Sequence, residues 1–167
     1  MLRNEVKIRK ANQNDGDFVL EAVHEMIKIC VGKKHIPFIP DDVAKSLWNG
    51  FIEDTQNSSI FIAEKDNKKV GVAVAQYHHT LHYLGPICNL QNHFVTSGNR
   101  YEGIGSALLE AIEKEAYDAG CVAVELLMPN PGTHLDKERN LFYEKKGYIL
   151  EGYSRYKTLK PIYPIIE

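Results

Sequence analysis

The stretch from Val95 to Ile112, VTSGNRYEGIGSALLEAI, constrains the fold of this chain more than any other. Gly103 and Gly105 stand two residues apart, between a polar loop and a strongly helical run. The start of a helix offers backbone N–H groups without acceptors and the positive end of the helix dipole, and both attract anions. The glycines remove side chains where a phosphate would otherwise meet Cβ atoms. This stretch therefore predicts a strand, a phosphate-binding loop and a helix in succession.

Three phosphate-binding designs compete for this loop. A Walker loop needs a lysine before the helix, and GIGSA has none. A dinucleotide fingerprint needs a third small residue where this chain has Leu108, and it belongs to an N-terminal strand–helix–strand unit. The third pattern, Arg-x-x-Gly-x-Gly, is satisfied by Arg100, Gly103 and Gly105, and it holds a pyrophosphate without a metal. A glycine-rich helix entry with no ligand is the alternative.

Hydrophobic periodicity predicts the elements on either side of the loop. Before it we expect a strand at EVKIRKA, a helix over NDGDFVLEAVHEMIKICVG, a helix from Asp41 to Ile52, a hairpin turning at Asp66-Asn67 and a fourth strand, ICNLQNHFV. After it we expect a helix from Ile104 to Ala119, a buried strand at CVAVELLM, a helix ending in RNLFYEKKG and a strand or hairpin over YILEGYSRYKTL. This order predicts a mixed α/β fold with helices on both faces of the sheet.

Length and composition favour one domain spanning residues 1–167. A chain of 167 residues, 44% hydrophobic and 25% charged, can bury a sizeable core. The net charge of −2 argues against a nucleic-acid partner, because neutralising phosphates takes a basic surface. The N-terminus lacks the apolar segment of a signal peptide, and no run approaches the ~18 apolar residues of a membrane span. We therefore expect a cytoplasmic protein with no membrane partner.

The cysteine and histidine patterns predict no metal site. Cys30, Cys88 and Cys121 lie in apolar runs without CxxC spacing, and no neighbour completes a zinc pattern. We expect them to be buried free thiols. The histidine-rich stretch from His78 to His82 is expected to form a solvated hairpin turn rather than a metal site.

Two segments of the chain resemble motifs of the GNAT superfamily of acetyl-CoA-dependent N-acetyltransferases. NHFVTSGNRYEGIGSALLEAIEKEA is similar to the family's acetyl-CoA motif, with Val95 five residues before Arg100. NLFYEKKGY resembles the second signature, a helix that carries a tyrosine just before a glycine. The resemblance covers roughly residues 5 to 157 and implies a mostly antiparallel sheet of about six or seven strands, with about four helices on both faces.

The resemblance implies that acetyl-CoA binds at the end of the fourth strand and along the loop. The residues it assigns to the cofactor are Phe94, Val95, Thr96, Arg100, Tyr101, Glu102, Gly103, Ile104, Gly105, Ser106, Asn140 and Tyr143. Tyr143 would also protonate the departing coenzyme A sulfur, and a core tyrosine is the alternative reading. The loop departs from the family's usual Arg-Gly-Lys-Gly at Glu102, which adds negative charge near a pyrophosphate unless its side chain points to solvent.

Acetyl transfer to an amine also requires that the ammonium lose a proton. Many relatives carry a glutamate on the fourth strand, where this chain has Asn89, Gln91 and His93 at alternating positions. These three share one face if the strand is regular, whereas a bulge would overturn that parity. Only His93 among them is titratable, and an unperturbed histidine pKa of about 6.5 suits a base. Deprotonation through ordered water is the alternative.

The acceptor cleft is expected to be lined by Asn89 and Gln91, with His35 and Phe38 from the first interhelical loop. The missing carboxylates weaken a polyamine assignment and leave an amino acid, a peptide N-terminus or an aminoglycoside open. We predict an N-acetyltransferase that moves the acetyl group of acetyl-CoA directly to a small-molecule or peptide amine in a ternary complex. Family habit favours a homodimer. A non-catalytic acyl-CoA-binding or sensing module and a protein- or tRNA-modifying enzyme are the alternatives.

Overall fold

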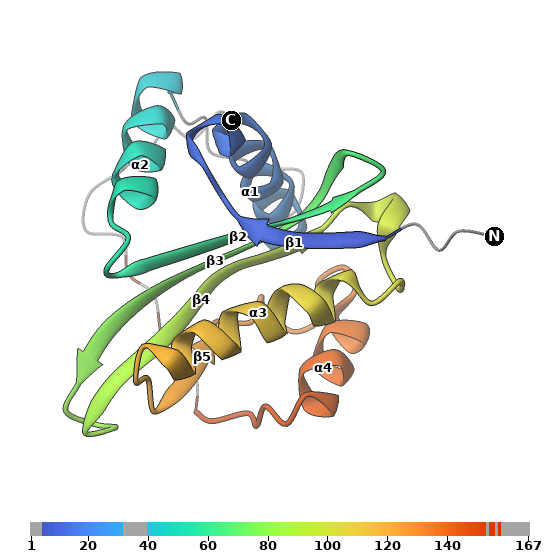
Figure 1. Ribbon diagram of the computed structural model, residues 1–167. Helices are drawn as coiled ribbons and strands as arrows, with labels where there is room; N and C mark the ends of the chain where they lie inside the picture. The colour runs from blue at the N-terminus through green and yellow to red at the C-terminus, as the bar shows by residue number, and fades with distance from the viewer. Residues whose placement is uncertain (1–4, 32–39, 153, 156, 158–167) are drawn as a thin grey trace. The chain divides into compact units, whose positions relative to one another are not determined.

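Figure 1 shows the computed structural model, which describes residues 5–31, 40–152, 154, 155 and 157. The chain divides into two compact units. One comprises Met1–His24 and Pro40–Leu126, and the other comprises Glu25–Ile39 and Leu127–Glu167. The single domain expected from the sequence stays a prediction.

The first unit is built on one sheet, whose described strands run in the order β1-β2-β3-β4-β5. These strands are β1 (Val6–Lys10), β2 (Ser58–Lys65), β3 (Lys68–Thr80), β4 (Gly85–Val95) and β5 (Ala123–Leu126). Strands β1 to β4 pair antiparallel, and β5 pairs parallel with β4. A parallel pair needs a crossover, which α3 (Ile104–Asp118) supplies. The mixed, mostly antiparallel α/β fold is thus confirmed.

The helices also follow the sequence prediction within the described residues. Besides α3 they are α1 (Gly16–Val31), α2 (Asp41–Glu53) and α4 (Asp136–Lys145). The sheet has five described strands rather than six or seven. Residues 148–152 form no strand, and most of the remaining stretch that was expected to do so lies outside the described residues. No helix of the described chain is both long enough and apolar enough to cross a membrane.

Helices pack on both faces of the sheet in the first unit (Figure 1). On one face, the start of α1 and Trp48 of α2 join the strands in one apolar cluster: Val19, Ala22, Trp48, Ile60, Ile62, Val72 and Val74. On the other face, α3 buries Leu108, Leu109 and Ile112 completely. Each such side chain contributes about 2 kcal/mol by leaving water. The two layers hold the start of α3 in place at the end of β4.

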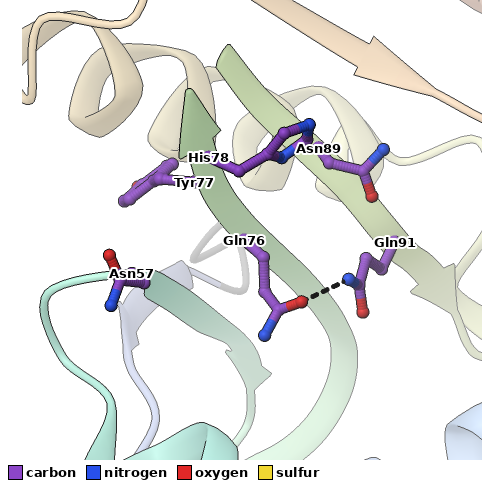
Figure 2. A pocket seen from close by; sticks show the side chains of 6 residues that line it. All are labelled: Asn57, Gln76, Tyr77, His78, Asn89 and Gln91. Atoms are coloured by element: carbon purple, nitrogen blue, oxygen red, sulfur yellow. Dashed lines mark hydrogen bonds between the residues drawn. The ribbon is translucent and has the colours of Figure 1, made fainter. Parts of the chain in front are cut away.

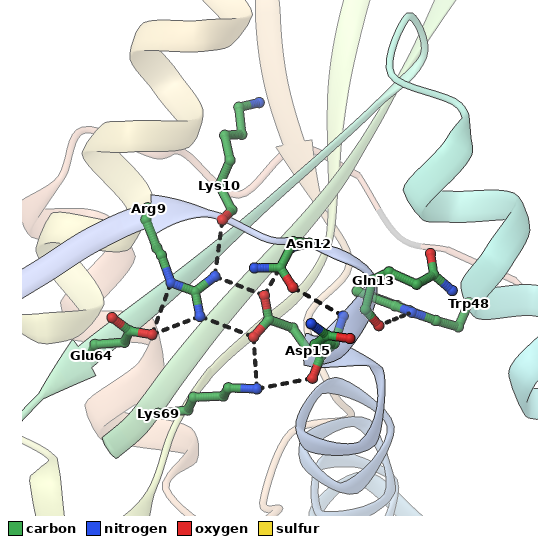
Figure 3. Close-up of polar contacts among 9 residues, drawn as sticks. Arg9, Lys10, Asn12, Gln13, Asp15, Trp48, Glu64 and Lys69 are labelled. Atoms are coloured by element: carbon green, nitrogen blue, oxygen red, sulfur yellow. Dashed lines mark hydrogen bonds and ion pairs between the residues drawn. The ribbon is translucent and has the colours of Figure 1, made fainter. Parts of the chain in front are cut away.

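A buried carboxylate joins β1 to the start of α1 (Figure 3). Asp15, which is 1% exposed, accepts a hydrogen bond from Arg9 Nη1 at 2.7 Å, and Lys69 Nζ lies 2.7 Å from its other oxygen. Arg9 also donates to Glu64 on β2. Burial alone would raise the pKa of Asp15, but hydrogen bonds from Arg9 and Lys69 outweigh it and hold that pKa well below its usual range.

The hairpins differ in how well the sequence predicted them. Asp66 and Asn67 have φ angles of 51° and 59°, as a two-residue turn of type I′ requires, so that turn is confirmed. The next hairpin is longer than expected, because β3 continues to Thr80. His78 and His79 therefore lie within a strand rather than in the predicted turn.

Candidate active site

Strand β4 is irregular where the sequence argument needed a regular strand. Ala75 of β3 pairs with Leu90, and the preceding Val74 pairs with Asn92. Gln91 is therefore an extra residue on β4, which makes a β-bulge there. A bulge changes the alternation of side chains along a strand. The parity argument from the sequence fails at this point.

His93 consequently lies on the face of the sheet that α3 covers. Its Nε2 donates to the backbone carbonyl of Gly105, in the first turn of α3, at 2.9 Å. Burial lowers the pKa of His93 to about 4, and the bond to Gly105 only partly offsets this effect. The ring links β4 to α3 and faces away from Asn89. The role of base expected of His93 stays a prediction, which the burial and the low pKa of the ring disfavour.

The start of α3 has the geometry expected of an anion site. Gly103 is its N-cap, with a φ of 85°, a value that few residues other than glycine adopt. No side chain in the described chain caps this end. The first helical bond runs from Ala107 N–H to the Gly103 carbonyl, so the N–H groups of Ile104, Gly105 and Ser106 precede it. These three donors and the helix dipole converge at one place.

Other residues of the loop hold its shape and balance its charge. Arg100 Nε donates to the Val95 carbonyl at 3.1 Å, and its guanidinium lies 5.9 Å from the centre of the Phe94 ring. Glu102 forms an ion pair with Lys65 at the end of β2, which counters the negative charge beside the helix start. The Glu102 side chain is 41% exposed, so it need not point at a bound pyrophosphate.

The remaining residues predicted to bind the cofactor in this unit differ in exposure. Tyr101 is 84% exposed and has a left-handed backbone, with φ of 65°. Ile104 is 1% exposed and belongs to the core, so only its backbone can serve a ligand. Thr96 donates its N–H to the Val70 carbonyl of β3, which closes the sheet beside the loop.

Two predicted residues lie on α4 in the second compact unit. The Tyr143 ring packs edge-on against Phe142 and Tyr148, with centroids 5.0 Å and 5.5 Å away. Burial raises the pKa of Tyr143, while the charge of Arg139 acts in the opposite direction. The phenol therefore stays protonated at neutral pH, as a proton donor must. Asn140 Nδ2 donates to the backbone carbonyl of Asp136.

An open pocket of about 370 Å³ lies over β3 and β4 (Figure 2). Its lining residues in the described chain are Asn57, Gln76, Tyr77, His78, Asn89 and Gln91. Asn89 and Gln91 were predicted for the acceptor cleft, and the structure brings them together. Gln91 Nε2 donates to Gln76 Oε1 at 2.7 Å. His35 and Phe38, the other predicted acceptor residues, lie outside the described residues.

The sequence did not point to Glu125, a carboxylate beside this pocket. Glu125 is the register partner of Asn89 across the parallel β4–β5 pair. Asn89 Nδ2 donates to Glu125 Oε1 at 3.1 Å. The family pattern places a carboxylate on the fourth strand, whereas here the strand–helix–strand crossover brings a carboxylate on β5 next to β4. The predicted strand–helix–strand order was therefore the sequence signal that could have indicated Glu125.

Two cysteines of the described chain are free thiols. Cys88 is buried and free, and burial raises the pKa of its thiol to about 12. Cys121 is free and partly buried. The described residues contain no group of three or more His, Cys, Asp or Glu side chains that could hold a metal ion.

The family match is decisive. Residues 56–150, more than half of the chain, match the family described as the acetyltransferase (GNAT) domain. The chain belongs to the GNAT acetyltransferase family. That family uses acetyl-CoA. No curated protein matches the chain in sequence.

Solved structures share the fold over nearly the whole GNAT chain. The aminoglycoside N-acetyltransferase AAC(6')-Iy in complex with CoA is similar at a TM-score of 0.75 and 18% identity, covering 96% of this chain and 99% of that one. An aminoglycoside acetyltransferase from an uncultured soil metagenomic sample, in complex with sisomicin, has a TM-score of 0.72, 19% identity and coverage of 93% and 97%. Glucosamine-6-phosphate N-acetyltransferase from Arabidopsis thaliana is similar at a TM-score of 0.67 and 18% identity, covering 93% of this chain and 99% of that one. At these identities the likeness establishes the fold alone.

Proposed function

We propose that this GNAT protein transfers the acetyl group of acetyl-CoA to a primary amine, by direct attack in a ternary complex. The start of α3 carries the proposal. The left-handed Gly103 and the three backbone N–H groups that follow it stand in the Arg-x-x-Gly-x-Gly pattern of a GNAT chain. A pyrophosphate is the anion that such a helix start suits.

The direction of β4 leads from this anion site to the pocket. Val95 ends the strand beside the loop, and Gln91 lies four residues earlier, about 13 Å away along an extended strand. In the described chain, β5 pairs with β4 only over Ile87–Leu90. An extended pantetheine arm that follows β4 from Val95 would therefore bring the thioester to the pocket at Gln91. Backbone N–H groups around Val95 would position the arm.

We assign to Glu125, in place of His93, the removal of a proton from the acceptor's ammonium group. Its carboxylate bonds to Asn89, which lines the pocket. A carboxylate there can hold the ammonium and accept its proton before the amine attacks the thioester carbon. The carbonyl carbon becomes tetrahedral, and the attacking nitrogen gains a positive charge. The C–S bond then breaks, the thiolate of coenzyme A leaves, and the nitrogen releases its second proton to solvent, which gives the neutral amide.

We propose that Tyr143 donates a proton to that leaving thiolate, because the family motif surrounds this tyrosine. Its raised pKa is consistent with a phenol that stays protonated until a thiolate forms. Asn140, one turn earlier on α4, is proposed to bind coenzyme A on the same ground. Direct transfer is preferred over an acyl-cysteine route, because the Cys88 thiol has a pKa of about 12 and is not a thiolate at neutral pH.

An amine acceptor is also supported by the shared fold. The similar structures are named as acetyltransferases of aminoglycosides and of glucosamine 6-phosphate, which are amines. The test is release of free coenzyme A from acetyl-CoA in the presence of a panel of primary amines. We expect turnover with at least one amine, and a loss of about 100-fold in kcat for Tyr143→Phe with acetyl-CoA affinity unchanged. Binding of acetyl-CoA without turnover of any amine would favour the non-catalytic module.

A further inference from the structure

The pocket over β3 and β4 is lined by carboxamides and by no carboxylate within the described chain. Four of its six lining side chains are amides: Asn57, Gln76, Asn89 and Gln91. Each amide carries one acceptor oxygen and one NH₂ donor, without charge. Hydroxyl groups both donate and accept, so they pair well with such a lining. Several ammonium groups would meet no counter-charge there.

Two hydrogen bonds fix how these amides face the pocket. Gln91 Nε2 donates to Gln76 Oε1 at 2.7 Å, which turns the Gln76 NH₂ and the Gln91 oxygen to other partners (Figure 2). A donor and an acceptor side by side suit one hydroxyl group. Asn89 donates one N–H to Glu125, so its oxygen and its second N–H remain for a ligand. The amides thus present both kinds of hydrogen-bonding atom in a fixed arrangement.

The charge beside the pocket matches one ammonium group. Two carboxylates bond to lining residues, Asp54 through Asn57 and Glu125 through Asn89. Both oxygens of Asp54 accept hydrogen bonds from Asn57 itself, whereas Asn89 bonds to one oxygen of Glu125. The volume of about 370 Å³ lies toward the lower end of the range of about 300–1,000 Å³ for small-ligand sites. This size suits a single ring better than the several rings of an aminoglycoside.

We infer that the acceptor is a polyhydroxylated monoamine, with the chemistry of an amino sugar, rather than a polyamine or a polycationic aminoglycoside. This inference rests on the proposed function, since the pocket is taken to receive the amine. The ammonium lies toward Glu125, and the hydroxyl groups bond to Gln76 and Gln91. The acetylated product would be a neutral amide.

Binding to the protein saturated with coenzyme A tests the inference without depending on turnover. Coenzyme A has no acetyl group, so each ternary complex is stable and its affinity can be measured by calorimetry. The probes are glucosamine, cyclohexylamine as a ring monoamine without hydroxyls, spermidine and sisomicin. We expect glucosamine to bind at least about tenfold more tightly than the other three. Tighter binding of spermidine or sisomicin, or binding of none of the four, would overturn the inference.

A variant of the lining separates recognition of hydroxyls from general effects on the pocket. Gln76→Leu should weaken glucosamine about five- to tenfold, the loss expected for one hydrogen bond, and leave cyclohexylamine unchanged. Gln56→Leu, the same change at an exposed residue outside the lining, should alter neither. Unchanged glucosamine affinity in Gln76→Leu would contradict the inference. If coenzyme A itself does not bind, the proposed function fails instead, and the same titrations without it still decide the preference of the pocket.

Discussion

Asn89 on β4 donates to Glu125 on β5 across 3.1 Å. The two residues face each other in the parallel register of these strands. Asn89 lines the pocket, so the bond holds a carboxylate at the edge of a site whose own lining, in the described chain, contains no carboxylate. In this chain the neighbouring strand supplies the carboxylate that the fourth strand lacks.

Replacing that carboxylate should slow the reaction more at low pH than at high pH. Glu125→Gln removes the proton acceptor but keeps the size of the side chain, so we expect kcat/KM to fall about 100-fold at pH 7. The loss should shrink as pH rises, because more of the amine is then already unprotonated. The pH profile of kcat/KM measures both effects. Glu21→Gln, at an exposed position of α1, is the matched control. A uniform loss at every pH would contradict a role in proton removal.

His93 should affect stability rather than proton transfer. Its pKa of about 4 in the folded protein lies below the value of about 6.5 in the unfolded chain. The unfolded state therefore binds more protons between these values, and stability falls by about 2–3 kcal/mol as pH drops from 6.5 to 4. His93→Gln, which keeps a donor for Gly105, should lose less over that range in urea unfolding. A large loss of kcat/KM in His93→Gln at pH 7 would restore the histidine as a base.

The carboxylate of Asp15 should stabilise the fold down to acidic pH. Its pKa is held below the usual range, so its contribution is present above about pH 4 and is lost as pH falls through the folded pKa. Asp15→Asn leaves Arg9 and Lys69 without their buried partner and should cost about 3 kcal/mol at pH 7. Asp17→Asn, at an exposed site in the first turn of α1, should cost less than about 1 kcal/mol. Equal losses in chemical unfolding would show that the network adds little.

The pair Lys65–Glu102 should tune affinity for the cofactor. Lys65→Met leaves the Glu102 charge uncompensated beside the helix start, so acetyl-CoA should bind a few-fold more weakly at low salt. Glu102→Gln should bind as tightly as the native protein or more tightly, and the double variant should recover from Lys65→Met. Calorimetric titration at two salt concentrations measures the acetyl-CoA affinity of each variant. If Lys65→Met and the double variant bind equally weakly, Lys65 acts on the cofactor by another route.

The local elements were predictable, because they depend on patterns within one segment. Asp66-Asn67 specified its turn, and the run after Gly103 specified α3. The bulge at Gln91 was not predictable, since it arises from pairing with β3, and it moved His93 to the other face. Glu125 lies 36 residues after Asn89 in the chain, beyond the crossover from β4 to β5, and only three-dimensional pairing reveals that contact. The homodimer and the cytoplasmic location stay predictions.

The central claim is that bare backbone at Gly103 receives the pyrophosphate of acetyl-CoA. Calorimetric titration with acetyl-CoA tests it most directly, on the native protein, on Gly103→Asp and on Gly120→Asp. Gly103 and Gly120 have φ angles of 85° and 81° with open space around them, and they flank opposite ends of α3, so both variants add the same strain and charge. We predict binding by the native protein and by Gly120→Asp, and a loss of at least about tenfold in Gly103→Asp. Equal affinity in both variants, or no binding by the native protein, would contradict the claim.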